Sequence, residues 1–422
     1  MTPTFRPLAR RQRRSLLAGL LLLVTAFVPA REWDREPDVL VPARGREVEG
    51  YLVRMDDERV HFQVETRDEF FAREEVETIR SPLVLYPEFA DRLGQSRPGD
   101  RESAVQLARW CQDVGLELEA EYAWWRVLAY DWNDAEAHEA LGSKEKSKGW
   151  QVKIDRRYYY RDKLYKRVED WKTALELDLA LFKVRSSARL EDTLDAMSAM
   201  VTGYMMVYEL FGDLMQVPYP REYIFVHLHG DSKTYPPLNK RSAYFEAGEN
   251  RIVADTTLWD GPATIVHEMT HALLANAYKM IDDNRGSAPA WLTEGMAEHV
   301  AAEIEARMNG VPSRLETPRA QRYLEVHALA EEPVELNRLL VAALDDFHDL
   351  GGSEEFYAQA FTLVLFLMDA DEEAYRSRFE TFLRGTYEGK SSPTHFEEAM
   401  ADNEMEEFEE RWHAWVRGIA PR

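Results

Sequence analysis

Residues 265–272 read IVHEMTHA, and residues 289–299 read PAWLTEGMAEH. In the first stretch His267 and His271 are four positions apart, so on an α-helix their imidazoles lie about 40° apart on one face and can bind one metal ion. Glu268 lies about 100° further round the helix, beside that ion, where its carboxylate can take a proton from a metal-bound water. The apolar residues on both sides of the motif predict a buried helix, which gives such a site a dry wall.

The second stretch offers a third ligand. Zinc hydrolases with two histidine ligands need one more protein ligand, often a glutamate from a following helix, and keep one position open for water. Glu294 lies 23 residues after His271, which is enough for the first helix to end, a loop over 282–287 to turn, and an antiparallel helix to return. Glu298 lies one turn beyond and can accept the free ring N–H of a ligating histidine. Gly295 allows two helices to approach closely. The alternative is a metal-free helix with two histidines on a polar face.

These two stretches also resemble a known family. HEMTH followed by WLTEGMAEH resembles the gluzincin metallopeptidases, specifically the peptidase-MA-like bacterial proteins. It is more distantly similar to the aminopeptidase N group, whose motif is HExxH with a later W-L-N-E-G-F-A. The resemblance covers about residues 220–370 and is sharp only at the two stretches. It implies one zinc ion, with His267, His271 and Glu294 as ligands, Glu268 as general base and Glu298 as the acid behind a histidine, which is Asp in the thermolysin branch.

A third stretch, residues 357–367 (YAQAFTLVLFL), is similar to the Y-E-K-G-x-x-x-L-x-x-L helix of the aminopeptidase group. The resemblance implies that Tyr357 donates to the oxyanion of the tetrahedral intermediate. Gln359 and Ala360 replace the Lys and Gly of that motif, so a core tyrosine that opens an amphipathic helix remains the alternative. The G-A-M-E-N exopeptidase loop is missing from the sequence, and an aminopeptidase is therefore not predicted.

The composition limits the other classes of function. The 422-residue chain has 52 Lys and Arg against 76 Asp and Glu, a formal net charge of −24. This balance argues against a nucleic-acid partner, because phosphate binding needs clustered cations. Cys111 is the single cysteine, which excludes an intramolecular disulfide and a cysteine metal cage.

The first thirty residues predict export. A basic start without acids precedes an apolar run of 14 residues, 15–28, and small residues follow at positions 28–30. This is the layout of a signal peptide over residues 1–30, which sends the protein to the periplasm, cell envelope or medium. The run is shorter than the roughly 20 residues of a spanning helix. An uncleaved membrane anchor is the alternative, and we expect contact with a membrane only through it.

The rest of the chain predicts three domains. Short β runs place a small, barrel-like β domain at 31–82. Helical periodicity over 83–148 indicates a helical module, in which AEAHEALG at 135–142 resembles a tetratricopeptide hairpin. The module is either a packed connector or a surface for a protein partner. A charged linker, residues 143–148, precedes a catalytic domain at 149–422.

The catalytic domain begins with strands and ends with helices. We expect one strand at 173–184, a long helix at 190–211, a strand at 222–228, and a hairpin of 243–245 with 251–254. Residues 251–254 are either an edge strand for an extended substrate or an ordinary hairpin arm. Because nearly everything after residue 262 has helical period, the fold class is α+β, with a thermolysin/gluzincin-like catalytic domain as the resemblance implies.

The sequence therefore predicts an exported zinc hydrolase that cleaves peptide bonds in a peptide or protein substrate. The alternative from another class is a zinc-stabilised, catalytically inactive protein of the cell envelope that binds a partner through the helical module. A metal-free structural protein of the envelope is the third possibility.

Overall fold

The computed structural model describes residues 34–96, 99–215, 217–236, 242–281, 288–348, 353–370, 373–387, 389–390, 392–400 and 405–421. Arg35–Arg422 form one compact unit. The predicted signal peptide, with its apolar run, and the predicted loop at 282–287 lie outside the described residues. Among the residues that are described, no helix is both long and apolar enough to cross a membrane.

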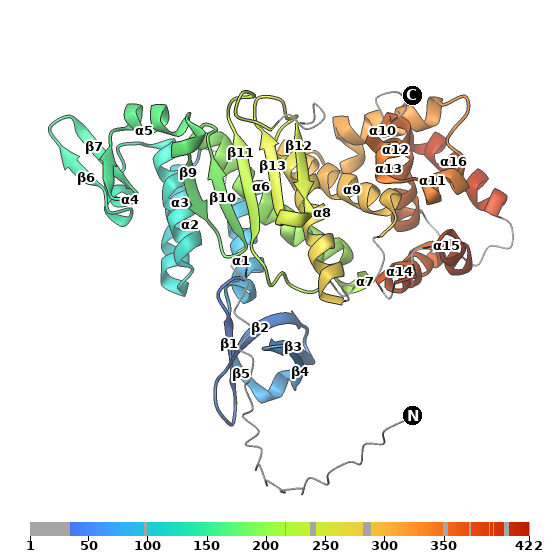
Figure 1. Cartoon of the computed structure of the whole chain (residues 1–422), viewed down its shortest axis with the longest axis horizontal. Helices are drawn as coiled ribbons and strands as arrows, with labels where there is room; N and C mark the ends of the chain where they lie inside the picture. The colour runs from blue at the N-terminus through green and yellow to red at the C-terminus, as the bar shows by residue number, and fades with distance from the viewer. Residues whose placement is uncertain are drawn as a thin grey trace, which may run out of the picture. The chain divides into compact units, whose positions relative to one another are not determined.

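Residues 38–80 form a five-stranded antiparallel sheet within the range where the sequence predicts a small β domain (Figure 1). Its strands lie in the order β4-β3-β2-β1-β5, and Leu40, Leu52 and Phe62 contribute to its own hydrophobic core. Alternating burial along the strands produces that core. The strands are β1 (Asp38–Pro42), β2 (Val48–Met55), β3 (Arg59–Val64), β4 (Arg67–Ala72) and β5 (Val76–Arg80).

Four helices follow: α1 (Pro82–Gln95), α2 (Arg101–Val114), α3 (Glu117–Tyr130) and α4 (Ala135–Ala140). Their buried side chains belong to the same hydrophobic core as the sheet and helices that come after them. The Glu119 carboxylate on α3 accepts a hydrogen bond from Ala180 N at 2.9 Å. The Tyr122 hydroxyl lies 2.6 Å from Ser198 Oγ. One face of the helical module is therefore used for packing, as a connector requires.

The predicted charged linker at 143–148 is wrong in part, because Lys144–Lys146 form a strand, β6. It pairs with β7 (Gly149–Ile154), which pairs with β8 (Arg157–Tyr159), and α5 (Arg161–Val168) follows. All three residues of β6 are exposed. Because the strand is held by backbone pairing and not by burial, its side chains show no apolar alternation that a sequence pattern could detect.

A second five-stranded sheet has the order β12-β13-β11-β10-β9. Strands β10, β11 and β13 run parallel, and the two outer strands are antiparallel to their neighbours. The predicted strand at residues 222–228 and the hairpin of residues 243–245 with 251–254 are confirmed. The strands are β9 (Leu175–Asp178), β10 (Phe182–Ser186), β11 (Ile224–His229), β12 (Ala243–Glu246) and β13 (Arg251–Asp255).

One expectation about this sheet is wrong, and one of two alternatives is excluded. Residues 173–184 are not one strand but the hairpin β9–β10, closed by Leu179 and Phe182, whose backbone groups bond each other. Leu179 and Leu181 in the turn are as buried as the strand residues, so the apolar alternation continues through the turn and hides it. Residues 251–254 are not an edge strand, because β13 lies between β12 and β11. The edge is β12.

After β13 the described chain is helical, which confirms the mixed α+β architecture (Figure 1). Helix α8 packs against α6 and α9, and α9 packs against α13. The α-helix predicted at 190–211 ends at Val207 and continues as a π turn, Tyr208–Gly212. The helices are α6 (Leu190–Val207), α7 (Asp213–Met215), α8 (Ala263–Ile281), α9 (Ala290–Asn309), α10 (Pro318–Leu329), α11 (Leu336–Val341), α12 (Leu344–His348), α13 (Ser353–Asp369), α14 (Glu373–Tyr387), α15 (Pro393–Met400) and α16 (Met405–Ile419).

Gly295 allows the close approach expected of it, and its partner is α13. A Cβ added there would lie 2.4 Å from the backbone oxygen of Ala360 and 2.7 Å from Val364 Cγ2. We expect Gly295→Ala to lower the free energy of unfolding by about 1–3 kcal/mol, because backbone must move to admit the methyl group. Denaturant unfolding of Gly295→Ala and wild type measures this difference in free energy.

The matched control is Gly94→Ala in α1, where an added Cβ meets nothing within 4 Å. That variant should be stabilised by up to about 1 kcal/mol, because alanine has the higher helix propensity. Equal stabilisation of both variants would contradict the close packing of α9 on α13.

Candidate metal centre

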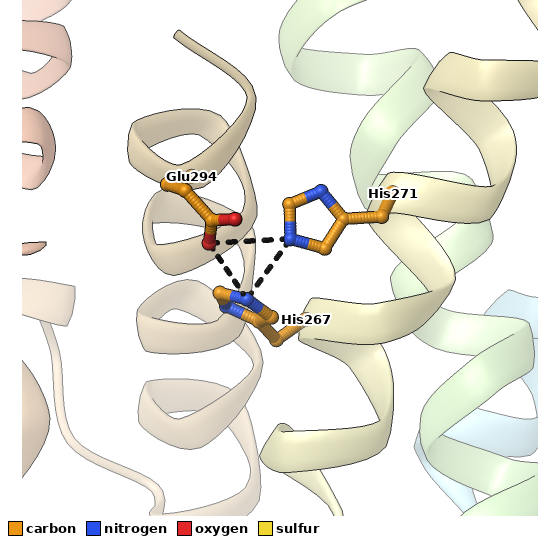
Figure 2. Close-up of side chains that lie close together, drawn as sticks. All are labelled: His267, His271 and Glu294. Carbon is orange, nitrogen blue, oxygen red and sulfur yellow. Dashed lines mark hydrogen bonds and ion pairs between the residues drawn. The ribbon is translucent and has the colours of Figure 1, made fainter. Parts of the chain in front are cut away.

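The two histidines of the HEMTH motif lie on successive turns of α8. The rest of the helix explains their orientation: Val266, Met269 and Ala272 are buried against the core. His267 is itself only 8% exposed, and His271 is half-buried, so the interpretation of two histidines on a solvent-facing polar surface does not fit. Glu294, on the neighbouring helix α9, is 3% exposed and points at both imidazoles (Figure 2).

One atom from each of the three side chains lies at a corner of a small triangle, which we call the triangle below. The Nε2 atoms of His267 and His271 are 3.1 Å apart, and Glu294 Oε2 lies 3.2 Å from the first and 3.3 Å from the second. Ligands bound to zinc at about 2.0–2.1 Å in a tetrahedron lie about 3.3–3.4 Å from one another. The triangle therefore has the size of one face of a zinc coordination tetrahedron. In the described part of the chain, this is the one group of three such side chains close enough to share an ion.

The polar chemistry of the triangle also fits a cation. Glu294 Oε2 is buried and, among the described residues, makes no hydrogen bond of acceptable geometry. Burial by itself would raise the pKa of Glu294, but the charges of His271 and His267 outweigh it and lower the pKa well below its usual value. An ionised oxygen buried in this way needs positive charge beside it, either on the two imidazoles, 3.2 and 3.3 Å away, or on a metal ion bound between them. Two imidazoles and a carboxylate are a ligand set typical of Zn²⁺.

Glu298 lies behind His267, where the sequence places it. Its Oε1 is 3.1 Å from His267 Nδ1, the ring nitrogen that faces away from the triangle. Its other oxygen accepts a hydrogen bond from Arg319 Nη1 at 2.7 Å. Burial raises the pKa of Glu298, yet the charges of Arg319 and His267 prevail and lower it to about 2. The carboxylate is thus ionised and joins the candidate metal centre to helix α10.

Arg319 is the residue that sequence reasoning missed. It lies at the start of α10, and Arg322 stands three positions further along the same helix. Arg322 pairs at the surface with Glu354. Nothing in the local sequence distinguishes the half-buried Arg319 from the exposed Arg322. Only the packing of α10 in three dimensions separates their roles.

The remaining two predicted residues lie next to the triangle. Glu268 is half-buried on α8. Burial would lower the pKa of His267, but Glu298, Glu294 and Glu268 together raise it well above its usual value. Tyr357, on α13, has its ring centroid 6.4 Å from that of His267. All six residues singled out in the sequence therefore lie in one region of the fold.

Comparison with known proteins adds one match. Residues 262–384 match a family described as a protein of unknown function (DUF1570). No curated protein matches the chain. The matched range holds α8, α9, α10 and α13, and with them each residue of the metal centre described above. The similarity therefore lies in the part of the chain that forms the site.

Proposed function

We propose that this protein is a zinc-dependent hydrolase of peptide bonds with a gluzincin-like catalytic domain. The observation that supports it best is the triangle of His267, His271 and Glu294, whose ligand atoms lie 3.1–3.3 Å apart beside a half-buried glutamate, Glu268. The resemblance of HEMTH and WLTEGMAEH to the gluzincins supports a peptide as substrate. The apolar run at residues 15–28 supports export.

Each protein residue has a separate task in this proposal. His267, His271 and Glu294 would hold a zinc ion, and its Lewis acidity would lower the pKa of a bound water to about 7. Glu268 accepts a proton from the attacking water and later returns it to the leaving amine, whose departure breaks the C–N bond. Tyr357 donates its phenolic O–H to the carbonyl oxygen as negative charge develops there. Glu298 holds the ring of His267 in place.

The test uses the mature chain, without residues 1–30, purified in the absence of chelators. We expect about one zinc ion per chain and cleavage of a proteome-derived peptide library. A chelator should abolish the cleavage, and added Zn²⁺ should restore it, because the ligands are one carboxylate and two imidazoles that bind metal reversibly.

The other outcomes identify the alternatives. Full zinc occupancy without cleavage of any peptide would favour the inactive, zinc-stabilised interaction protein. A zinc content near zero would favour the metal-free structural protein and remove the proposed metal centre.

A further inference from the structure

We infer that Arg319 is a positioning residue for the metal centre: it holds the carboxylate of Glu298 in the one orientation that makes His267 present Nε2 to the ion. This inference rests on the proposed metal centre. It adds helix α10, which supplies no ligand, to the parts of the chain on which metal affinity depends.

The geometry is a relay with Glu298 in the middle. Arg319 Nη1 donates to Glu298 Oε2 at 2.7 Å, and Glu298 Oε1 lies 3.1 Å from His267 Nδ1. The carboxylate is therefore held at both ends, by α10 on one side and by α8 on the other, while α9 carries it. With the contact to His267 alone, the carboxylate could rotate about its side-chain torsions. The contact to Arg319 removes that freedom.

The contacts of Glu298 determine which ring nitrogen of His267 carries the proton. The other nitrogen then keeps its lone pair for the ion. Nδ1 makes no hydrogen bond of acceptable geometry among the described residues, but it lies 3.1 Å from Glu298 Oε1. Because a carboxylate oxygen only accepts hydrogen bonds, this contact favours the tautomer in which Nδ1 carries the ring proton. Nε2 is then left unprotonated, and it is the atom that lies 3.2 Å from Glu294 Oε2 and 3.1 Å from His271 Nε2. If Glu298 were displaced, neither the tautomer nor the ring orientation of His267 would be fixed.

Arg319 is itself fixed in place. Its side chain is 18% exposed, and its Nε lies 3.8 Å from Glu305 Oε2, further along α9. The exposed arginine of the same helix, Arg322, instead pairs with Glu354.

A purely electrostatic role for Arg319 predicts the opposite effect on zinc. A positive charge near a divalent cation repels it, so removal of that charge alone would tighten zinc binding. Loss of positioning would instead weaken binding, because the partner of a ligating histidine is worth about 10–100-fold in metal affinity. The sign of the change therefore distinguishes the two roles.

The experiment measures the zinc dissociation constant of the mature protein by competition with a chromophoric chelator. We expect Arg319→Met to bind zinc about 10–100-fold more weakly than wild type. Arg319→Lys keeps the charge but not the planar guanidinium group. Its zinc affinity should lie between those of wild type and Arg319→Met. Arg322→Met, the matched control on the same helix, should bind zinc as wild type does. Unchanged or tighter binding by Arg319→Met would overturn the inference.

A double-mutant cycle tests whether Arg319 acts through Glu298. In a Glu298→Gln background, Arg319→Met should cause little further loss of zinc affinity, because the carboxylate that the guanidinium holds is already gone. A full, additive loss would show that Arg319 acts by another route and would overturn the inference. If circular dichroism shows that Arg319→Met is unfolded without metal, the comparison is made with Arg319→Lys.

The readout separates this inference from the proposed function. Zinc affinity is measured without any peptide substrate, so a protein that binds zinc but cleaves nothing fails the proposed function and still tests Arg319. If the wild type binds zinc tightly and the Arg319 variants bind it equally well, the inference fails while the metal centre stands.

Discussion

The Glu268→Gln variant should retain its zinc and lose turnover by about 10²–10⁴-fold or more, the usual contribution of a general base. Glutamine has the size and shape of glutamate, so the packing of α8 is preserved. Its amide oxygen, however, cannot hold the proton of the attacking water. Glu268 is half-buried next to His267 and stands outside the triangle of ligand atoms, so its replacement should not release the ion.

Two measurements decide this result. Zinc content by mass spectrometry should match wild type, and initial rates of peptide cleavage should fall. Glu325→Gln, at an exposed position of α10, makes the same change of charge away from the site and should keep full activity. Hydrolysis by Glu268→Gln at the wild-type rate would remove Glu268 from the mechanism.

The residues of the triangle could be predicted from the sequence because the information is local. Helical periodicity alone places His267 and His271 on one face of α8. The distance along the chain to Glu294 is that of one antiparallel helix pair, and the structure brings its Oε2 within 3.2–3.3 Å of both imidazoles. Gly295 similarly indicated a close contact between helices, although the sequence did not identify α13 as the partner.

The errors concern features that depend on distant parts of the chain. The position of β13 inside the sheet is set by its pairing with β11, a strand more than twenty residues earlier. The turn between β9 and β10 was hidden because Leu179 and Leu181 are buried by helices and strands elsewhere in the fold. Arg319 contacts Glu298 across 21 residues of sequence. None of these contacts produces a hydrophobic periodicity in the stretch of sequence around the residues that make it.

Metal ligands are easier to predict from the sequence than residues that only hold other side chains in place. A metal ligand must be one of a few residue types, so His267, His271 and Glu294 are conspicuous once their spacing is noticed. The groups that orient ligands have no such restriction, because many side chains can hold a carboxylate. Glu298 was predicted because it lies one turn from Glu294 on α9, whereas Arg319, which holds Glu298, comes from α10, and nothing in the sequence of that helix connects it to metal binding.

Replacing a ligand should have the largest effect on metal content. We expect His271→Ala and Glu294→Ala each to lose zinc on dialysis, because two protein ligands remain where the site was built for three. The loss should exceed the 10–100-fold expected for a residue that only supports a ligand. Glu303→Ala removes a glutamate from the same helix as Glu294, where it pairs with Arg314, and should keep its zinc.

Thermal unfolding provides a second readout of the same ligands. An ion that binds the folded chain stabilises it according to its concentration and affinity, so added Zn²⁺ should raise the melting temperature of wild type and of Glu303→Ala. The same addition should leave His271→Ala and Glu294→Ala almost unchanged. Full zinc occupancy in both ligand variants would disprove the assignment.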